Sequence, residues 1–214
     1  MRILFLALLG MGLTIPHIVQ ARPVSYPGGW TVMSMNNGEV NSAHIHYSPT
    51  AKTSVGYKFE YWRDKDFTLN AVQMNNLLKR WNEKDSQANL YLKSGIGVAH
   101  SNADDTDGET SGAGFTGMAA DWENRRFFIS YENRYTEAGD IDDFYQQSAR
   151  VGVTPYIGDY GDLHTWLMLD VQHSPENEDH FTVTPLVRFF KGVHLLEAGM
   201  NNHGEVLFNY VFRY

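Results

Sequence analysis

Hydrophobic and polar residues alternate with a period of two along most of the chain from Trp30 to the end. In "SVGYKFEYW", the residues Val55, Tyr57 and Tyr61 fall on one face of an extended chain, and Lys58 falls on the other. Nowhere does the i, i+3, i+4 spacing of an amphipathic helix persist. The pattern therefore predicts half-buried β-strands that follow one another without intervening helices.

The same alternation marks about twelve strands. We expect them near 30–36, 41–48, 54–63, 67–80, 87–100, 112–122, 126–135, 144–157, 163–173, 180–191, 193–201 and 204–214. The stretch "FTLNAVQMNNLLKRW", from Phe67 to Trp81, also fits a short amphipathic helix. We interpret it as a strand because strands are predicted on both sides of it. Ten strands remain an alternative if the first hairpin lies outside the wall.

The last eleven residues, "GEVLFNYVFRY", place Val206, Phe208, Tyr210, Phe212 and Tyr214 on one face. This segment resembles the final strand of bacterial outer-membrane β-barrels, which alternates aromatic with other residues and ends on Phe or Tyr.

The resemblance implies an all-β fold, a transmembrane antiparallel up-and-down β-barrel. Its last strand would pair with its first, so that no unpaired edge faces lipid. It also implies insertion into the outer membrane of a Gram-negative cell, in contact with lipid and lipopolysaccharide. Phe212 and Tyr214 would then form the signal that the barrel-assembly machinery reads. The alternative is a soluble β-sandwich or lipocalin-like barrel, which would turn its apolar faces inward.

The first residues have the features of an export signal. Arg2 gives a basic start, an apolar stretch follows, and "VQA" precedes Arg22. We therefore expect a signal peptide at 1–21 and a barrel at 22–214. Pro16 and His17 interrupt the apolar stretch, which is short for a membrane-spanning helix.

Composition narrows the function classes. Without the signal, sixteen basic residues face twenty-five acidic residues, and this balance argues against a nucleic-acid partner. The chain has no cysteine, so no disulfides can stabilise an exported fold. No later segment is apolar enough for a membrane-spanning helix, but barrel strands need only alternation.

The connections alternate in character. Three of those on one rim, "NADDTDGET", "TEAGDIDD" and "SPENEDH", hold eleven acidic residues and no Lys or Arg. We expect a solvated outer rim there. Loose binding of Ca²⁺ or Mg²⁺ is the alternative, although the EF-hand pattern fails because Ala103 stands at its first ligand position.

If the apolar faces meet lipid, the opposite faces line the interior. The charged residues expected to line the lumen are Lys58, Glu60, Lys93, Arg126, Glu132, Arg134, Arg150, Asp170, Arg188 and Arg213. Seven of these ten are basic. We therefore expect a small passive channel with a mildly cationic lumen that admits small anionic solutes.

Two other functions stay open. In "HIH", His44 and His46 lie on one face of a strand and could bind copper or zinc, with His164 or Met168 from another strand. The third function is a lipid hydrolase in the barrel wall. Its candidate residues near the strand ends are His100, Ser101, His173, Ser174 and His180, but no G-x-S-x-G motif marks a nucleophile. A purely structural barrel is the remaining alternative.

Overall fold

The computed structural model describes residues 23–159, 161–177 and 179–214, so the predicted signal peptide lies outside the described residues. Within these ranges the secondary structure consists of twelve strands. Their bounds are β1 Trp30–Asn36, β2 Val40–Tyr47, β3 Thr53–Trp62, β4 Phe67–Asn82, β5 Ser86–Ser101, β6 Thr110–Asn124, β7 Phe127–Glu137, β8 Asp143–Val153, β9 His164–His173, β10 Phe181–Lys191, β11 His194–Met200 and β12 Val206–Arg213. Among the described residues, no helix is long and apolar enough to cross a membrane.

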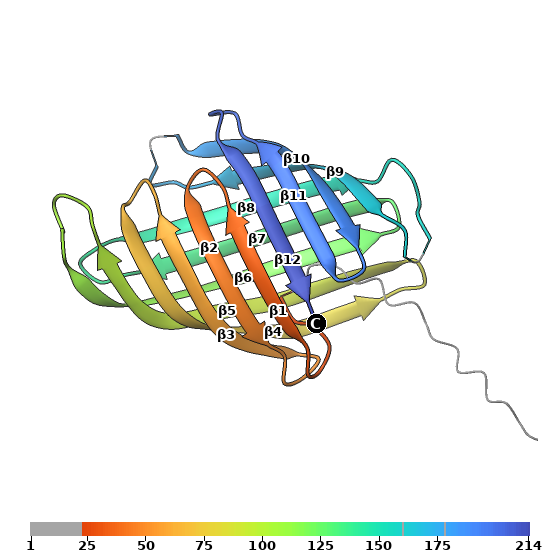
Figure 1. The fold of residues 1–214 in the computed structure, drawn as a ribbon, viewed down its shortest axis with the longest axis horizontal. Coiled ribbons are helices and arrows are strands. Elements are labelled where there is room, and N and C mark those ends of the chain that lie inside the picture. Colours follow the sequence, from red (N-terminus) through yellow and green to blue (C-terminus); the bar gives the residue numbers. More distant parts are fainter. Residues whose placement is uncertain (1–22, 160, 178) are drawn as a thin grey trace, which may run out of the picture.

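All twelve strands form one closed antiparallel barrel in which each strand pairs with its sequence neighbours (Figure 1). The wall closes where β1 pairs with β12, from Thr31 opposite Arg213 to Asn36 opposite Phe208. Beyond the strand itself, Tyr214 and Trp30 exchange two backbone hydrogen bonds. This closure confirms the predicted fold class. It also settles the strand number, because the first hairpin belongs to the wall.

The ambiguous segment is a strand and not a helix. β4 runs for sixteen residues and pairs with β3 and β5, and its register with β5 shifts once, at Leu78. The predicted strand 144–157 is too long, since β8 ends at Val153. Pro155 follows, and a proline has no N–H to continue the ladder.

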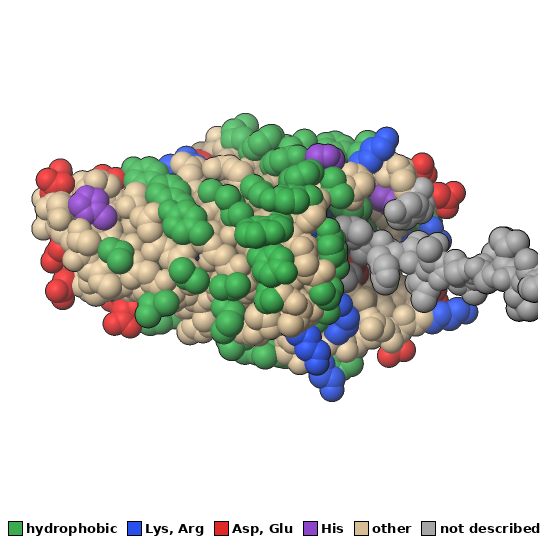
Figure 2. Space-filling view, turned by 60° about the horizontal axis from the view of Figure 1, so that its bottom comes forward, with side chains coloured by type: hydrophobic (Ala, Val, Ile, Leu, Met, Phe, Trp, Pro, Cys, Tyr) green, Lys and Arg blue, Asp and Glu red, His purple; other side chains and the backbone are tan. Residues whose placement is uncertain are grey.

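The outer surface of the barrel is apolar. Figure 2 shows hydrophobic side chains spread over the wall, with Asp and Glu at its two ends. Large apolar side chains exposed on the strands include Val55, Tyr57, Val72, Ile96, Ile129, Phe127, Phe181, Val206 and Phe208. Each alternates with a residue whose side chain faces inward, as the sequence pattern predicts. An apolar outer face with a polar inner face is the surface of a barrel embedded in a membrane.

The two rims differ. We call the rim that carries Trp30 and Tyr214 the terminal rim, and the opposite one, with the β1–β2 and β5–β6 connections, the distal rim. The wall is uneven in height, because β4, β5 and β6 have 15 to 16 residues and β1 and β11 have seven. A membrane strand needs about 9–11 residues. The β4–β6 part of the wall is therefore longer than a bilayer requires.

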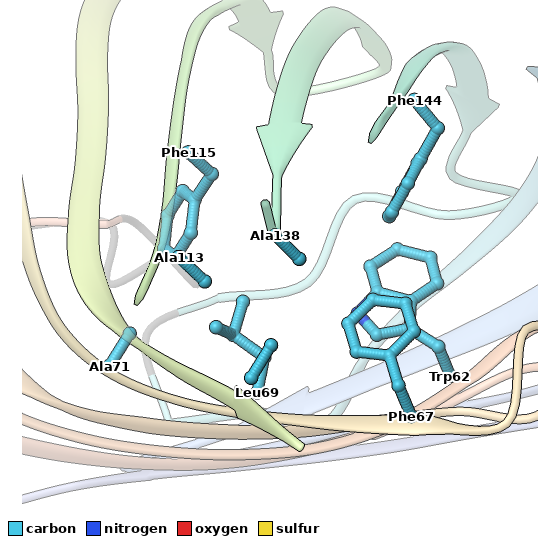
Figure 3. Packing of buried hydrophobic residues seen from close by; sticks show 9 residues of the cluster. Trp62, Phe67, Leu69, Ala71, Ala113, Phe115, Ala138 and Phe144 are labelled. Carbon is cyan, nitrogen blue, oxygen red and sulfur yellow. The ribbon is translucent and has the colours of Figure 1, made fainter. Parts of the chain in front are cut away.

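Apolar side chains fill part of the interior towards the distal rim. Trp62, Phe67 and Phe144 meet there, with ring centroids 4.7 to 6.2 Å apart, and Leu69 and Phe115 belong to the same cluster (Figure 3). These residues come from the distal ends of β3, β4, β6 and β8. This cluster joins the long strands of the wall from within.

A second, smaller cluster lies in the interior at the other end of β4 and β5. Val24 packs there against Leu77 and Tyr91, and the Pro23 carbonyl accepts hydrogen bonds from Ser54 and Asn75. The segment that precedes β1 therefore enters the barrel.

Candidate functional site

A cavity of about 370 Å³ lies inside the barrel, bordered by residues from around the wall. The side chains of each strand alternate between the two faces of the wall, and most of the residues that border this cavity are polar or charged. Ten charged side chains border the cavity: Lys58, Glu60, Lys93, Asp121, Glu132, Arg134, Arg150, Asp170, Arg188 and Glu197. Five are basic and five are acidic, so the formal charge of this lining is balanced.

One group of charges joins β3 to β7. Glu60 accepts hydrogen bonds from both terminal nitrogens of Arg134, at 2.6 and 2.7 Å, and pairs with Lys58 at 2.7 Å. Nearby, Lys93 on β5 pairs with Glu132 at 2.6 Å. Three strands of the wall separate β3 from β7, so the Glu60–Arg134 pair crosses the interior.

A second group joins β8 to β11. Arg150 donates to Asp170 at 2.7 Å and to Glu197 at 3.0 Å. Arg188 and Asn209 also donate to Glu197, at 2.6 and 2.8 Å. Glu197 was not among the lumen residues expected from the sequence. Leu195, Glu197 and Gly199 nevertheless share one face of β11 by their period-two spacing, and this pattern predicts that Glu197 faces inward.

Two expected lumen residues lie at the margins. Arg213 is buried, at the last position of β12. Arg126 lies outside the strands, exposed, in the turn between β6 and β7. The reason is local: the Asn124 side chain accepts hydrogen bonds from the backbone N–H groups of Arg126 and Phe127 and turns the chain there.

His44 and His46 lie side by side on β2 and border the cavity. Their ring centroids are 4.6 Å apart. The other two residues of the predicted metal set lie elsewhere: His164 is beside Phe190, and Met168 belongs to an apolar cluster with Phe128. Four strands separate β9 from β2 on the shorter way around the barrel. Within the described ranges, no group of three or more His, Cys, Asp or Glu side chains could hold a metal ion.

The turn between β1 and β2 reaches over the mouth of the lumen at the distal rim. Glu39, in this turn, accepts a hydrogen bond of 2.6 Å from Gln146 on β8 and another from Gln172 on β9. Asn177, in the β9–β10 connection, donates to the same carboxylate at 3.4 Å. The turn is thereby tied to the opposite wall.

The environment of Glu39 disfavours its charge. Burial raises the pKa of its carboxyl group above the ordinary value, and the neighbouring Asp64 and Glu205 act in the same direction. Hydrogen bonds from Gln172 and Gln146 oppose this shift in part. A small cavity of about 20 Å³, bordered by Glu39, Glu205 and Asp170, lies beside it and is large enough for about one water molecule.

The candidate residues of a hydrolase point to different sides of the wall. His100 bonds to Thr110, whereas Ser101 is fully buried and bonds to Thr106. His173 contacts Gln147 and Phe181. His100 and Ser101 are neighbours in β5 and therefore face opposite sides of the wall. Ser174 follows the end of β9, where its hydroxyl accepts hydrogen bonds from Gln146 and Gln172, and its backbone N–H donates to the carbonyl of His180.

The acidic connections lie on the distal rim, where the exposed aspartates of 102–109 stand at the end of the β5–β6 hairpin. Loose binding of Ca²⁺ or Mg²⁺ there stays a prediction.

No protein-family model and no curated protein sequence matches the chain. Two solved structures are similar to it. One is of KdgM porin, with a TM-score of 0.51 and 6% identity, and the other is of KdgM porin in complex with disordered oligogalacturonate, with a TM-score of 0.50 and 7% identity. Each alignment covers 87% of this chain and 98% of the porin chain. The likeness concerns the fold alone, a closed antiparallel barrel.

Proposed function

We propose that this chain is a passive channel for small solutes, with the barrel lumen as its path. The observation that carries this proposal is the charged and water-accessible cavity of about 370 Å³ inside an apolar wall. A barrel that serves only as a structural element in lipid could fill its interior with apolar side chains, as small filled barrels do. The similarity to KdgM porins supports the same function.

We further propose a weak preference for anions. The formal charges of the lining balance, but the basic side chains are the better exposed partners. Lys58 is 18% exposed and Arg134 14%, against 3% for Glu60. Arg150 is 17% exposed, against 3% for Glu197.

The cause is the number of hydrogen bonds each group can make. Glu60 and Glu197 are each surrounded by several donors, so their oxygens are already occupied. An arginine has five N–H donors and a lysine three, so donors remain for water or solute. The pair of Lys93 and Glu132 is the exception, since Glu132 is 44% exposed and Lys93 is 21% exposed.

Oligogalacturonate, present in one of the similar KdgM porin structures, carries carboxylates, which makes small acidic sugars reasonable solutes to test.

We also propose that the barrel lies in the outer membrane, inserted by the barrel-assembly machinery after removal of residues 1–21, with lipid and lipopolysaccharide around its wall. The apolar belt and the aromatic end of β12 support this location. The acidic distal rim would then face outside, and the terminal rim, with Trp30 and Tyr214, would face the periplasm. Fractionation of cells that produce the protein, followed by proteolysis of intact cells, tests both the location and the orientation.

The test of the channel is single-channel conductance of the refolded mature protein in a planar bilayer under a salt gradient. We expect steady conductance and a reversal potential of the sign that indicates anion preference. Lys93→Gln should shift the reversal potential towards cations. Lys79→Gln, a change outside the lumen where Lys79 lies over Trp81, is the matched control and should not shift it. A folded barrel without conductance would overturn the channel, and a cation preference would overturn the proposed solute class.

A further inference from the structure

His44 and His46 hold buried nitrogen atoms that have no hydrogen-bond partner among the residues that the structure describes. These are Nε2 of His44 and both ring nitrogens of His46. His46 is 0% exposed and His44 is 7% exposed. Buried polar groups in proteins are nearly always paired, so an unpaired set of this kind needs an explanation such as a missing ligand.

The strands on both sides of β2 shape a site around these two rings. Met33 on β1 lies directly opposite His44, and residues directly opposite in an antiparallel pair share one face. Met33 borders the same cavity. On the other side Gly56 lies opposite His46, and a Cβ at this glycine would stand 2.4 Å from the His46 Cα and 2.5 Å from its Cβ. The glycine leaves space for the imidazole.

We propose that His44 and His46, together with the thioether of Met33, form a binding site for a soft, singly charged metal ion, Cu(I), in the wall of the lumen. Thioether and imidazole groups together suit this ion, whereas hard cations require oxygen ligands. Two imidazole nitrogens that share a metal ion lie within about 4 Å of each other. Rings with centroids 4.6 Å apart allow that spacing.

The charges nearby favour a singly charged ion. Lys58 lies opposite His44 on β3, and Arg213 lies opposite Thr31, the residue that pairs with His46 on β1. Because Coulomb repulsion grows in proportion to charge, Zn²⁺ would be repelled by these cations about twice as strongly as Cu(I). The site therefore discriminates by charge as well as by ligand softness.

Silver is a suitable probe, since Ag(I) has the charge and softness of Cu(I) and does not need a reducing buffer. The experiment titrates silver nitrate into the refolded mature barrel in a chloride-free buffer, by calorimetry and by the temperature of unfolding. We expect one saturable site and a rise in the unfolding temperature, because a ligand that binds only the folded state stabilises it. X-ray absorption of the Cu(I) complex should show nitrogen together with sulfur scatterers.

The variants separate this site from incidental binding. We expect His44→Gln and His46→Gln each to weaken Ag(I) binding at least tenfold, and Met33→Leu to weaken it while it leaves the weaker Zn²⁺ response unchanged. His100→Gln and Met74→Leu, both on the outer face of the wall, are the controls and should bind silver as the unchanged protein does.

Three results would overturn the proposal. They are the absence of saturable silver binding to the folded barrel, silver binding that survives in the two histidine variants, and Zn²⁺ binding as tight as that of silver. If a histidine variant does not fold, which the mobility of heated and unheated samples on gels reveals, Met33→Leu still decides the case. The conductance experiment does not depend on the metal, so the two proposals fail separately.

Discussion

Arg134 on β7 reaches across the interior and binds both carboxylate oxygens of Glu60 on β3, at 2.6 and 2.7 Å. The two side chains are 14% and 3% exposed. Bidentate pairs of this kind combine strength with a fixed geometry. The pair therefore acts as a brace between two parts of the wall that do not pair with each other.

Removal of one partner of this brace should be costly. Arg134→Met leaves Glu60 buried with Lys58 as its remaining salt-bridge partner, and we expect a loss of about 3–5 kcal/mol in the free energy of unfolding. Adding both Glu60→Gln and Lys58→Gln should restore a large part of this loss, because no charge of this group is then left in the interior without its partner. Denaturant unfolding of the barrel in lipid vesicles measures both. Lys93→Gln, in a more exposed pair, is the control and should cost less than about 1 kcal/mol. If Arg134→Met and Lys93→Gln lower the free energy of unfolding equally, the Arg134–Glu60 pair does not brace the wall.

Glu39 should make the stability of the barrel depend on pH. Because the pKa of this carboxyl is raised in the folded state, the folded protein binds a proton more tightly than the unfolded chain does. Stability should therefore rise as the pH falls through the raised pKa, and the gain is complete below the ordinary value of 4.5. Glu39→Gln should be more stable than the unchanged protein at neutral pH and show less of this rise. Unfolding curves at several pH values test it, and identical pH dependence in both proteins would refute it.

Gly56 should not tolerate a side chain. A Cβ there would lie 2.0 Å from the Ile45 carbonyl oxygen, which belongs to the neighbouring strand and cannot move aside. We expect Gly56→Ala to lose about 1–3 kcal/mol of stability, the usual range for overpacking. Gly112→Ala is the matched control, because nothing lies within 4 Å of its Cβ position. A Gly56→Ala barrel as stable as the Gly112→Ala barrel would show that β2 and β3 can separate locally.

Tyr214 should matter for assembly more than for stability. Its ring stacks on Phe212 with centroids 5.4 Å apart, yet it is 56% exposed. We expect Tyr214→Ala to reduce the amount of folded barrel in the outer membrane of cells, while purified and refolded protein unfolds at nearly the same denaturant concentration. If cellular amounts are unchanged, the last aromatic residue is not the signal that the assembly machinery reads.

The sequence was sufficient to predict an all-β barrel of about twelve strands, since a period of two survives even in the ambiguous β4, whereas the choice between ten and twelve strands needed the structure. Strand ends were less certain. The alternation continues through Arg126 and predicts a strand there, whereas the backbone N–H of Arg126 donates to the Asn124 side chain and the chain turns instead. The alternation also contained Glu197, which the expected set of lumen residues omitted.

The partners across the lumen could not be predicted. Which residue of β3 meets which residue of β7 depends on the tilt and stagger of all the strands between them, and no local pattern encodes these quantities. The sequence also could not predict that basic and acidic side chains around the lumen cavity are equal in number. The sequence showed which basic residues face inward, whereas only the structure shows that Glu60 and Glu197 each bind several of them.

The pairing of β1 with β12 has a consequence for the order of folding. The other eleven pairings join consecutive strands and can form as soon as both strands are available. The last pairing joins residues as far apart as Asn36 and Asn209, which are 173 positions apart, and must await the end of the chain. Until then both edges of the sheet carry unpaired backbone groups, which attract other chains. A nearly finished sheet is therefore the most aggregation-prone species on the pathway, and the step that a chaperone has to protect is the final one.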